Sequence, residues 1–262
     1  MHAFKYHRAS NVNDASSLAK GDARLLAGGQ SLVQAMKLRL SSPTDLIDLG
    51  TIKELSGIKA SGTEVTIGAM TRHAEVAGSP DVKKAIPALA ALAGMIGDRQ
   101  VRAMGTIGGS LANNDPAADY PAAALGLGAT ITTNKRKIAA DDFFKGLYET
   151  ALQPGEVITS VTFPVPRRAG YTKFKNQASR FAIVGVFVAQ TANGARVAVT
   201  GAGSRGVFRV RAMEDALNKS WSPDAIKSVA VSPADLQSDL HASAEYRAHL
   251  INVLAMRAVS AA

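Results

Sequence analysis

The sequence contains no cysteine among its 262 residues. Disulfides, thiol catalysis and thiolate-held iron–sulfur or zinc sites are therefore excluded on this chain. Its five histidines are too dispersed to suggest a metal cluster, and no Gly-x-Ser-x-Gly nucleophile pattern occurs. Any redox metal centre that works with this chain must therefore lie on another subunit.

Long apolar runs are also missing. No stretch approaches the ~20 apolar residues that are needed to span a bilayer. The first residues, Met1 to Lys5, lack the apolar segment of a secretory signal. We therefore expect a cytoplasmic protein with no membrane insertion.

Aromatic residues are scarce, at 5% of the chain, although Lys and Arg (30) exceed Asp and Glu (21) by nine. The basic residues are scattered, with only short groups such as Lys135-Arg136-Lys137 and Arg167-Arg168. Nucleic-acid binding needs clustered cations, often interleaved with aromatic rings for stacking. The pattern favours a solvated basic face, or one that meets acidic partners or an anionic cofactor, over nucleic-acid binding. A basic binding protein without enzymatic activity remains an alternative.

Hydrophobic residues make up 47% of the chain and charged residues 19%, which is typical of a folded globular protein. Strand-like and helix-like segments alternate early and separate later, which predicts an α+β protein. We expect Pro87 to begin or divide a helix, residues 97–121 to form a long irregular loop, and Asp141-Asp142 to start a helix. Helices are predicted over 12–20, 32–40, 82–96, 122–127, 211–219, 222–227 and 242–259, and strands over 24–27, 44–49, 58–60, 65–67, 129–132, 157–163, 171–175, 184–190 and 196–200.

One glycine-rich segment, Gly201-Ala202-Gly203-Ser204-Arg205-Gly206, fits a dinucleotide-binding pattern and follows a predicted strand. The segments after it have helical periodicity, so the second parallel strand of a βαβ unit is missing. A flexible turn is the favoured interpretation. The alternative is a stand-alone NAD-dependent oxidoreductase that uses this turn.

Two other glycine turns carry the stronger signal. Gly28-Gly29 stands between a predicted strand and a predicted helix that Gln30 or Ser31 can cap. Such a connection presents backbone N–H groups to an anion, and glycine allows a phosphate to approach closely. Taken alone, the turn is equally consistent with a simple strand-to-helix connection.

The second turn runs from Gly105 to Pro116 and has Gly108-Gly109 between the hydroxyls of Thr106 and Ser110. Two such turns can clasp the two phosphates of a pyrophosphate, and a nearby carboxylate suits sugar or ribityl hydroxyls. Asp119 lies nine positions after Ser110 and is the candidate. Its alternative role is to cap the helix that follows.

The motifs resemble the molybdenum hydroxylase flavoprotein family, which includes the medium chain of aerobic carbon monoxide dehydrogenase and the flavin domain of xanthine dehydrogenase. The segment Leu25 to Leu32 with Met36-Lys37-Leu38-Arg39-Leu40 is similar to its first FAD motif, and Gln100 to Pro121 is similar to its second. Phe143 to Leu152 and Phe174 to Phe181 also match, so the resemblance covers nearly the whole chain.

The resemblance implies a two-lobed FAD-binding domain of the PCMH/VAO-like type, with lobes at 1–50 and 51–166, followed by a C-terminal α+β domain at 167–262 with an antiparallel sheet and helices. It implies non-covalent FAD, with molybdopterin and two-iron iron–sulfur clusters on partner subunits. The partners would be an iron–sulfur small subunit and a molybdopterin large subunit in a dimer of heterotrimers. This chain would pass electrons from those clusters to an external acceptor, and it would contribute no catalytic acid, base, nucleophile or metal ligand.

The resemblance also implies individual FAD contacts. The pyrophosphate would be held by Leu25, Leu26, Ala27, Gly28, Gly29, Gln30, Ser31 and Leu32 and by Thr106, Ile107, Gly108, Gly109 and Ser110, and the flavin's hydroxylated chain by Asp119. Ile96, Ile158 and Lys175 match further contacts, with core or surface positions as alternatives. Phe181 would lie beside the isoalloxazine or pack in the core.

Two positions depart from the family pattern. Gln34 stands where many relatives have proline, and Arg102-Ala103-Met104-Gly105 lacks an asparagine that often follows the arginine. Neither departure affects the glycines of the two turns. FAD binding is therefore still expected.

Overall fold

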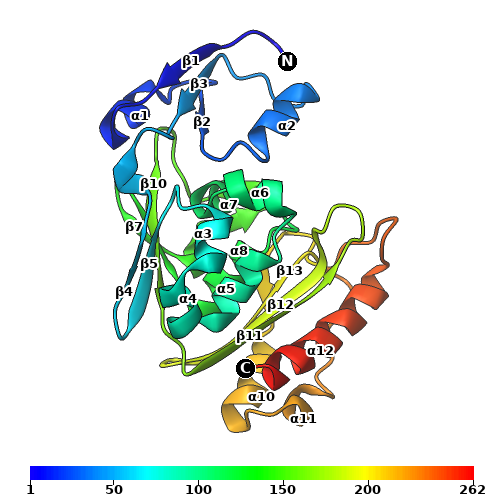
Figure 1. Ribbon diagram of the computed structural model, residues 1–262. Helices are drawn as coiled ribbons and strands as arrows, with labels where there is room; N and C mark the ends of the chain where they lie inside the picture. Colours follow the sequence, from blue (N-terminus) through cyan, green and yellow to red (C-terminus); the bar gives the residue numbers. More distant parts are fainter.

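A computed structural model describes residues 1–262, and three main sheets follow one another along the chain. Figure 1 shows a small N-terminal lobe, a middle lobe with its own sheet and a bundle of helices, and a C-terminal sheet with helices on its outer side. The middle helices lie between the second and third sheets. The α+β class and the antiparallel C-terminal sheet expected from the sequence are confirmed.

The N-terminal lobe is a parallel three-stranded sheet in the order β1-β3-β2 with two helices. Its central strand carries Ile47, which is fully buried in the small core of this lobe with Ala15 and Leu49. Strand β1 was not predicted: its sequence Lys-Tyr-His-Arg has no apolar run, and it forms an edge that pairs only with β3. The elements are β1 (Lys5–Arg8), α1 (Val12–Leu18), β2 (Arg24–Leu26), α2 (Leu32–Lys37) and β3 (Asp45–Asp48).

Helix α2 is shorter than predicted. It ends at Lys37, and Arg39 adopts a left-handed conformation with φ of 60° that turns the chain away. Leu38 and Leu40 are therefore 71% and 79% exposed, and the prediction that the helix continues to residue 40 is wrong. The Ser31 side chain makes no capping hydrogen bond, and the Gln30 side chain donates to the Gly28 carbonyl instead, so neither predicted cap forms.

The middle lobe has a five-stranded antiparallel sheet in the order β4-β5-β10-β6-β7. Its helices cover one face of the sheet. Pro87 stands in the first turn of helix α5 and separates it from helix α4. The elements are η1 (Lys53–Leu55), β4 (Ile58–Ala60), β5 (Glu64–Gly68), α3 (His73–Gly78), α4 (Pro80–Ala85), α5 (Pro87–Gly94), α6 (Arg99–Met104), α7 (Ile107–Asn113), α8 (Tyr120–Leu127), β6 (Thr130–Thr133), β7 (Lys137–Ala139), α9 (Ala140–Phe143), β8 (Phe144–Gly146), β9 (Glu149–Thr150) and β10 (Ile158–Pro164).

The long irregular loop predicted over 97–121 is instead two short helices, α6 and α7, and the start of α8. The Asp98 side chain accepts a hydrogen bond from the Val101 N–H, and Thr106 accepts one from the Gly109 N–H. These side chains cap the helices and offset the poor helix propensity of the glycines. The glycine content dominated the sequence pattern and concealed both caps.

The C-terminal sheet is antiparallel in the order β11-β12-β13-β14, and both of its faces are covered. Phe187 and Ala198 on one face join the core of the middle helices, whereas Val186 and Val199 on the other pack against the outer helices. The elements are β11 (Arg168–Lys175), β12 (Ala182–Thr191), β13 (Gly194–Thr200), β14 (Phe208–Arg209), α10 (Arg211–Lys219), α11 (Pro223–Ile226) and α12 (Ala244–Ser260). No helix has the length and apolar character required to cross a membrane.

Candidate functional site

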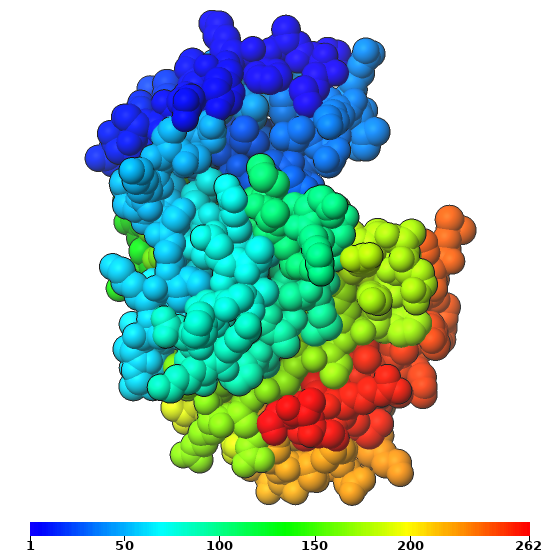
Figure 2. Space-filling model, in the orientation of Figure 1, coloured from blue at the N-terminus to red at the C-terminus, as the bar shows by residue number.

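A cavity of about 660 Å³ opens where the N-terminal lobe, the middle lobe and the C-terminal sheet meet. The space-filling view shows the molecule notched between the blue N-terminal lobe and the yellow-green part of the chain (Figure 2). The first glycine turn, helix α7, residues 152–158 and Phe181 all contribute to the lining. The fold therefore brings both glycine turns to one cavity, as the sequence predicted.

The first turn joins β2 to α2 and requires glycine at two positions. A β-carbon at Gly28 would lie 2.1 Å from the carbonyl oxygen of Met104, which is an impossible contact. Gly29 has φ of +71°, a left-handed conformation that other residues adopt only at a cost. The turn therefore packs directly against the end of α6.

The backbone of this turn is unusually rich in free donors. All six consecutive N–H groups from Ala27 to Leu32 make no hydrogen bond within the protein. Unpaired backbone donors are rare when they are not facing water or a ligand. Successive free N–H groups that converge on one side of a turn form an anion-binding concavity, so this segment suits a phosphate group.

The second turn is built differently. Thr71 and Ala69 accept hydrogen bonds from the N–H groups of Ile107 (3.1 Å) and Gly108 (2.8 Å), so these donors are already used. The Gly109 and Ser110 N–H groups donate to the side chain and the carbonyl of Thr106. The first turn therefore has free N–H groups that could meet an anion, whereas those of Ile107, Gly108, Gly109 and Ser110 in the second are used within the protein. The Ser110 side chain remains available beside the cavity.

Asp119 lines the cavity but is only 4% exposed. Lys173 lies 2.9 Å from its Oδ1, and the Tyr171 hydroxyl donates to that oxygen at 2.5 Å. The carboxylate makes no capping bond to α8, so the alternative role as a helix cap is wrong. Burial raises the pKa of Asp119, and the adjacent Lys173 ammonium and Tyr171 hydroxyl oppose that shift. The group therefore ties the middle lobe to the C-terminal sheet.

Most of the other predicted residues also reach the cavity. Ile96, Ile158 and Phe181 line it, and Ile158 is at the same time a core residue with 6% exposure. Phe181 is 49% exposed, so the alternative of a packed core position is wrong. Leu26 and Ile107 lie behind the lining, and Lys175 lines a neighbouring hollow instead.

His73 is a cavity residue that the sequence did not reveal. It is 5% exposed, its ring packs 5.3 Å from that of Tyr120, and its Nδ1 has no hydrogen-bond partner. Burial, assisted by the Arg102 charge, lowers the pKa of His73 to about 4. No local motif marks this residue, because its surroundings come from segments distant in the sequence.

The depressed pKa of His73 predicts a loss of stability in mild acid. The unfolded histidine takes up a proton near its ordinary pKa of 6.5, whereas the folded one resists until about pH 4. The stabilisation is therefore complete above pH 6.5 and is lost as the pH falls from 6.5 to 4, by about 3 kcal/mol. Urea unfolding of the wild type and of His73→Gln across this range should show the loss only in the wild type; parallel pH profiles would contradict the assignment.

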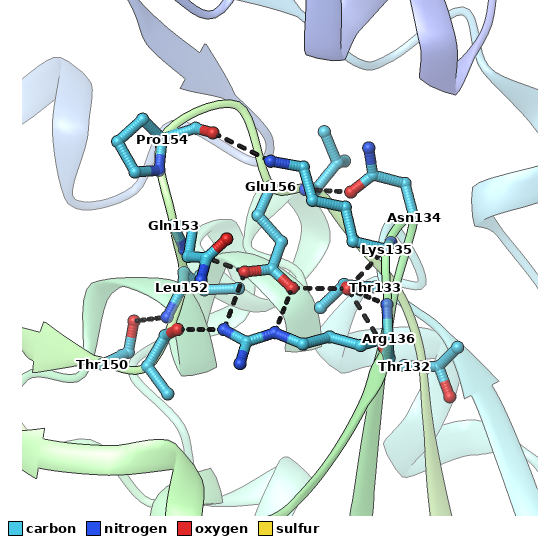
Figure 3. Close-up of polar contacts among 12 residues, drawn as sticks. Thr132, Thr133, Asn134, Lys135, Arg136, Thr150, Leu152, Gln153, Pro154 and Glu156 are labelled. Atoms are coloured by element: carbon cyan, nitrogen blue, oxygen red, sulfur yellow. Dashed lines mark hydrogen bonds and ion pairs between the residues drawn. The ribbon is translucent and has the colours of Figure 1, made fainter.

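Residues 152–158, which form one wall of the cavity, are held by the buried Glu156 (Figure 3). Its carboxylate accepts hydrogen bonds from Arg136 Nε at 3.0 Å, the Thr133 hydroxyl at 2.7 Å and the Gln153 N–H at 2.8 Å. Desolvation would raise the pKa of Glu156, but these donors outweigh it and lower the pKa to about 2. Glu156 is thus a charged anchor that attaches the cavity wall to the β6–β7 turn.

The glycine turn at 201–206 does not form a nucleotide site. The Gly201 N–H donates to the carbonyl of Pro116, and the next strand, β14, pairs antiparallel with β13. The parallel βαβ unit that a dinucleotide site requires is absent. The interpretation as a turn is confirmed, and no group of histidine and acidic residues is arranged to hold a metal ion.

Both parts of the chain are similar to known protein families. Residues 2–166 match the model of the FAD binding domain in molybdopterin dehydrogenase, and residues 169–262 match that of the CO dehydrogenase flavoprotein C-terminal domain. The carbon monoxide dehydrogenase medium chain of Afipia carboxidovorans is 36% identical over 99% of this chain and 96% of its own length. The nicotine 6-hydroxylase medium subunit of Paenarthrobacter nicotinovorans is 36% identical over 98% and 96%. A chain in the structure of reconstituted CO dehydrogenase from Oligotropha carboxidovorans superposes with a TM-score of 0.90 at 33% identity, over 99% of this chain and 97% of that one.

Proposed function

The chain belongs to the FAD-binding flavoproteins of the molybdopterin dehydrogenases, and from this premise we propose that its cavity of about 660 Å³ holds FAD non-covalently for electron transfer. The observation that carries the proposal is the run of six free N–H groups from Ala27 to Leu32 at one end of this cavity. A pyrophosphate supplies the oxygens that these donors lack. The volume also lies within the range of pockets that bury cofactor-sized ligands.

Most of the predicted contacts have a role in this proposal, whereas Lys175 lines a separate hollow and has none. The first turn would bind the pyrophosphate through its backbone, and Ser110 of the second turn would add a hydroxyl. Asp119 would accept hydrogen bonds from the ribityl chain with its remaining lone pairs, since Lys173 and Tyr171 fix its orientation. Ile96, Ile158 and Phe181 would contact the flavin ring and shield it from water.

When bound, FAD supplies the electron-accepting and electron-donating chemistry. The residues of this chain bind and orient it, and His73 stays neutral at pH 7 because of its lowered pKa. A neutral imidazole beside the cavity adds no charge to the site. No residue here is required to act as an acid, base or nucleophile.

Partner subunits follow from the same proposal. The chain has no cysteine for an iron–sulfur cluster and no metal-binding group, and its relatives bear the names medium chain or medium subunit. We propose an iron–sulfur small subunit that delivers electrons and a molybdopterin large subunit that oxidises the substrate, in a dimer of heterotrimers. The reducing substrate would then be selected outside this chain.

Native purification followed by a visible spectrum tests the proposal. We expect a yellow protein with about one FAD per chain, released by denaturation because the binding is non-covalent, together with two copurifying subunits. The stripped chain should regain its flavin spectrum when FAD is added. A colourless protein that cannot be reconstituted would contradict FAD binding, and a flavin-loaded chain without partners would contradict the proposed assembly.

A further inference from the structure

A second hollow of about 330 Å³ lies beside the FAD cavity, between the segment joining α5 to α6 and strand β11. Its lining is almost entirely polar backbone and cationic side chains: Gly94, Met95, Gly97, Arg102, Lys173, Lys175 and Arg180. Four of these seven residues carry a positive charge. None of them is acidic.

Three of the four cations have no acidic partner. Lys173 is paired with Asp119, but Arg102, Lys175 and Arg180 form no ion pair. Arg102 donates to the carbonyls of Ile96 (2.9 Å) and Gly97 (3.1 Å) through a single nitrogen, Nη1, so its other donors remain free. The nearby Asp98 carboxylate accepts a hydrogen bond from the Val101 N–H at the start of α6 and forms no ion pair with these cations.

Two further features of the hollow support an anion-binding site. Arg180 has φ of 63°, a left-handed conformation that is costly for a residue with a β-carbon. Its Nη1 donates a hydrogen bond of 3.4 Å to the carbonyl oxygen of Gly97. Lys175 follows a register shift in the β11–β12 pairing, and its side chain makes no hydrogen bond to the protein. Like charges that converge on one hollow repel each other, and an oxyanion would relieve that repulsion.

We propose that this hollow binds a small phosphate-type oxyanion, either inorganic phosphate or the terminal group of a phosphate monoester. Arginine donors arranged as forks match tetrahedral oxyanions, and a lysine ammonium adds a compact charge. The volume admits one phosphate with part of an attached group, at the lower end of small-molecule sites. This site is separate from the pyrophosphate position at the first glycine turn.

The hollow and the FAD cavity share a wall. Ile96, Val101 and Phe181 line the FAD cavity, and their neighbours Gly97, Arg102 and Arg180 line the hollow. The Lys173–Asp119 pair crosses the same wall. An anion in the hollow should therefore perturb the flavin environment, a consequence that rests on the proposed FAD function, whereas anion binding itself does not.

Isothermal titration calorimetry with inorganic phosphate tests the proposal on the full native protein with its copurifying subunits. Chloride holds the ionic strength constant. The variant Lys175→Gln/Arg180→Gln should bind phosphate at least tenfold more weakly than the wild type, which corresponds to about 1.4 kcal/mol. The control Lys59→Gln/Lys219→Gln removes the same charge from exposed positions outside the hollow and should bind as the wild type does. Circular dichroism melting of both variants checks that they are folded.

A parallel titration with AMP distinguishes the two sources of the ligand: tighter binding than phosphate assigns the site to a phosphate monoester, and equal or weaker binding assigns it to the free ion. The proposal is overturned if the wild type does not bind, or if both double variants lose binding equally, since the effect is then one of net charge. It is also overturned if the isolated chain binds phosphate and the native complex does not, since a partner segment then fills the hollow. If the protein binds phosphate but contains no flavin, the FAD proposal fails and the phosphate proposal stands.

Discussion

Gly28→Ala is expected to weaken FAD binding by about 10- to 100-fold. The added β-carbon would lie 2.1 Å from the Met104 carbonyl oxygen, and neither partner is a flexible side chain that can move aside. Overpacking of this kind costs about 1–3 kcal/mol, and every 1.4 kcal/mol is a factor of ten in affinity. The displaced turn carries the six free N–H groups, so the cost falls on the pyrophosphate donors.

The measurement is the FAD content of the purified variant and its affinity after reconstitution. Gly62→Ala is the matched control, because its β-carbon meets nothing within 4 Å. The control should retain the wild-type affinity. A Gly28→Ala protein with unchanged affinity would show that the first turn does not hold the cofactor.

Lys173→Met is expected to destabilise the protein by about 3–5 kcal/mol. Lys173 and Asp119 are 1% and 4% exposed at their side chains, so removing the ammonium leaves an unpaired carboxylate in the interior. Breaking a buried pair from one side carries a cost of this size, whereas neutralising both partners together avoids the uncompensated charge. The double variant Asp119→Asn/Lys173→Met should therefore recover at least half of the lost stability.

Urea unfolding of the wild type, the two single variants and the double variant gives the coupling energy. Lys59→Met serves as the control, since Lys59 is an exposed strand lysine with no ion pair, and it should change stability by less than about 0.5 kcal/mol. Additive effects in the double variant would contradict a pairing that joins the middle lobe to the C-terminal sheet.

The local elements of the fold were largely predictable from the sequence. The hairpin of β4 and β5, the division of a helix at Pro87 and the turn between β12 and β13 follow from alternation, proline and an Asn-Gly pair. The errors arose where local signals were weak or conflicting. Strand β1 is a charged edge, and α6 and α7 are short helices that depend on their caps.

The candidate site also has features that the sequence predicted and features that it did not. Both glycine turns were found in the sequence, because close backbone approach can be met only by glycine and leaves a readable pattern. The sequence did not show that only the first turn has free N–H groups. In the second turn the N–H groups of Ile107 and Gly108 donate to the carbonyls of Thr71 and Ala69, which lie more than thirty residues earlier in the chain. Similarly, the pairing of Lys173 with Asp119 was not found in the sequence, because the two residues are distant in the chain and no local pattern marks Lys173.

The sequence by itself determined that this chain carries no cysteine-based redox centre, that it has two ordered glycine turns, and that an α+β fold is expected. These are properties of composition and of residues adjacent in the chain. Only the tertiary structure decided which backbone donors remain free, which carboxylate is paired, that His73 is held neutral, and that four cations share a hollow beside the main cavity. Each of these depends on burial and on charges brought together from distant segments, and the folded packing alone sets both.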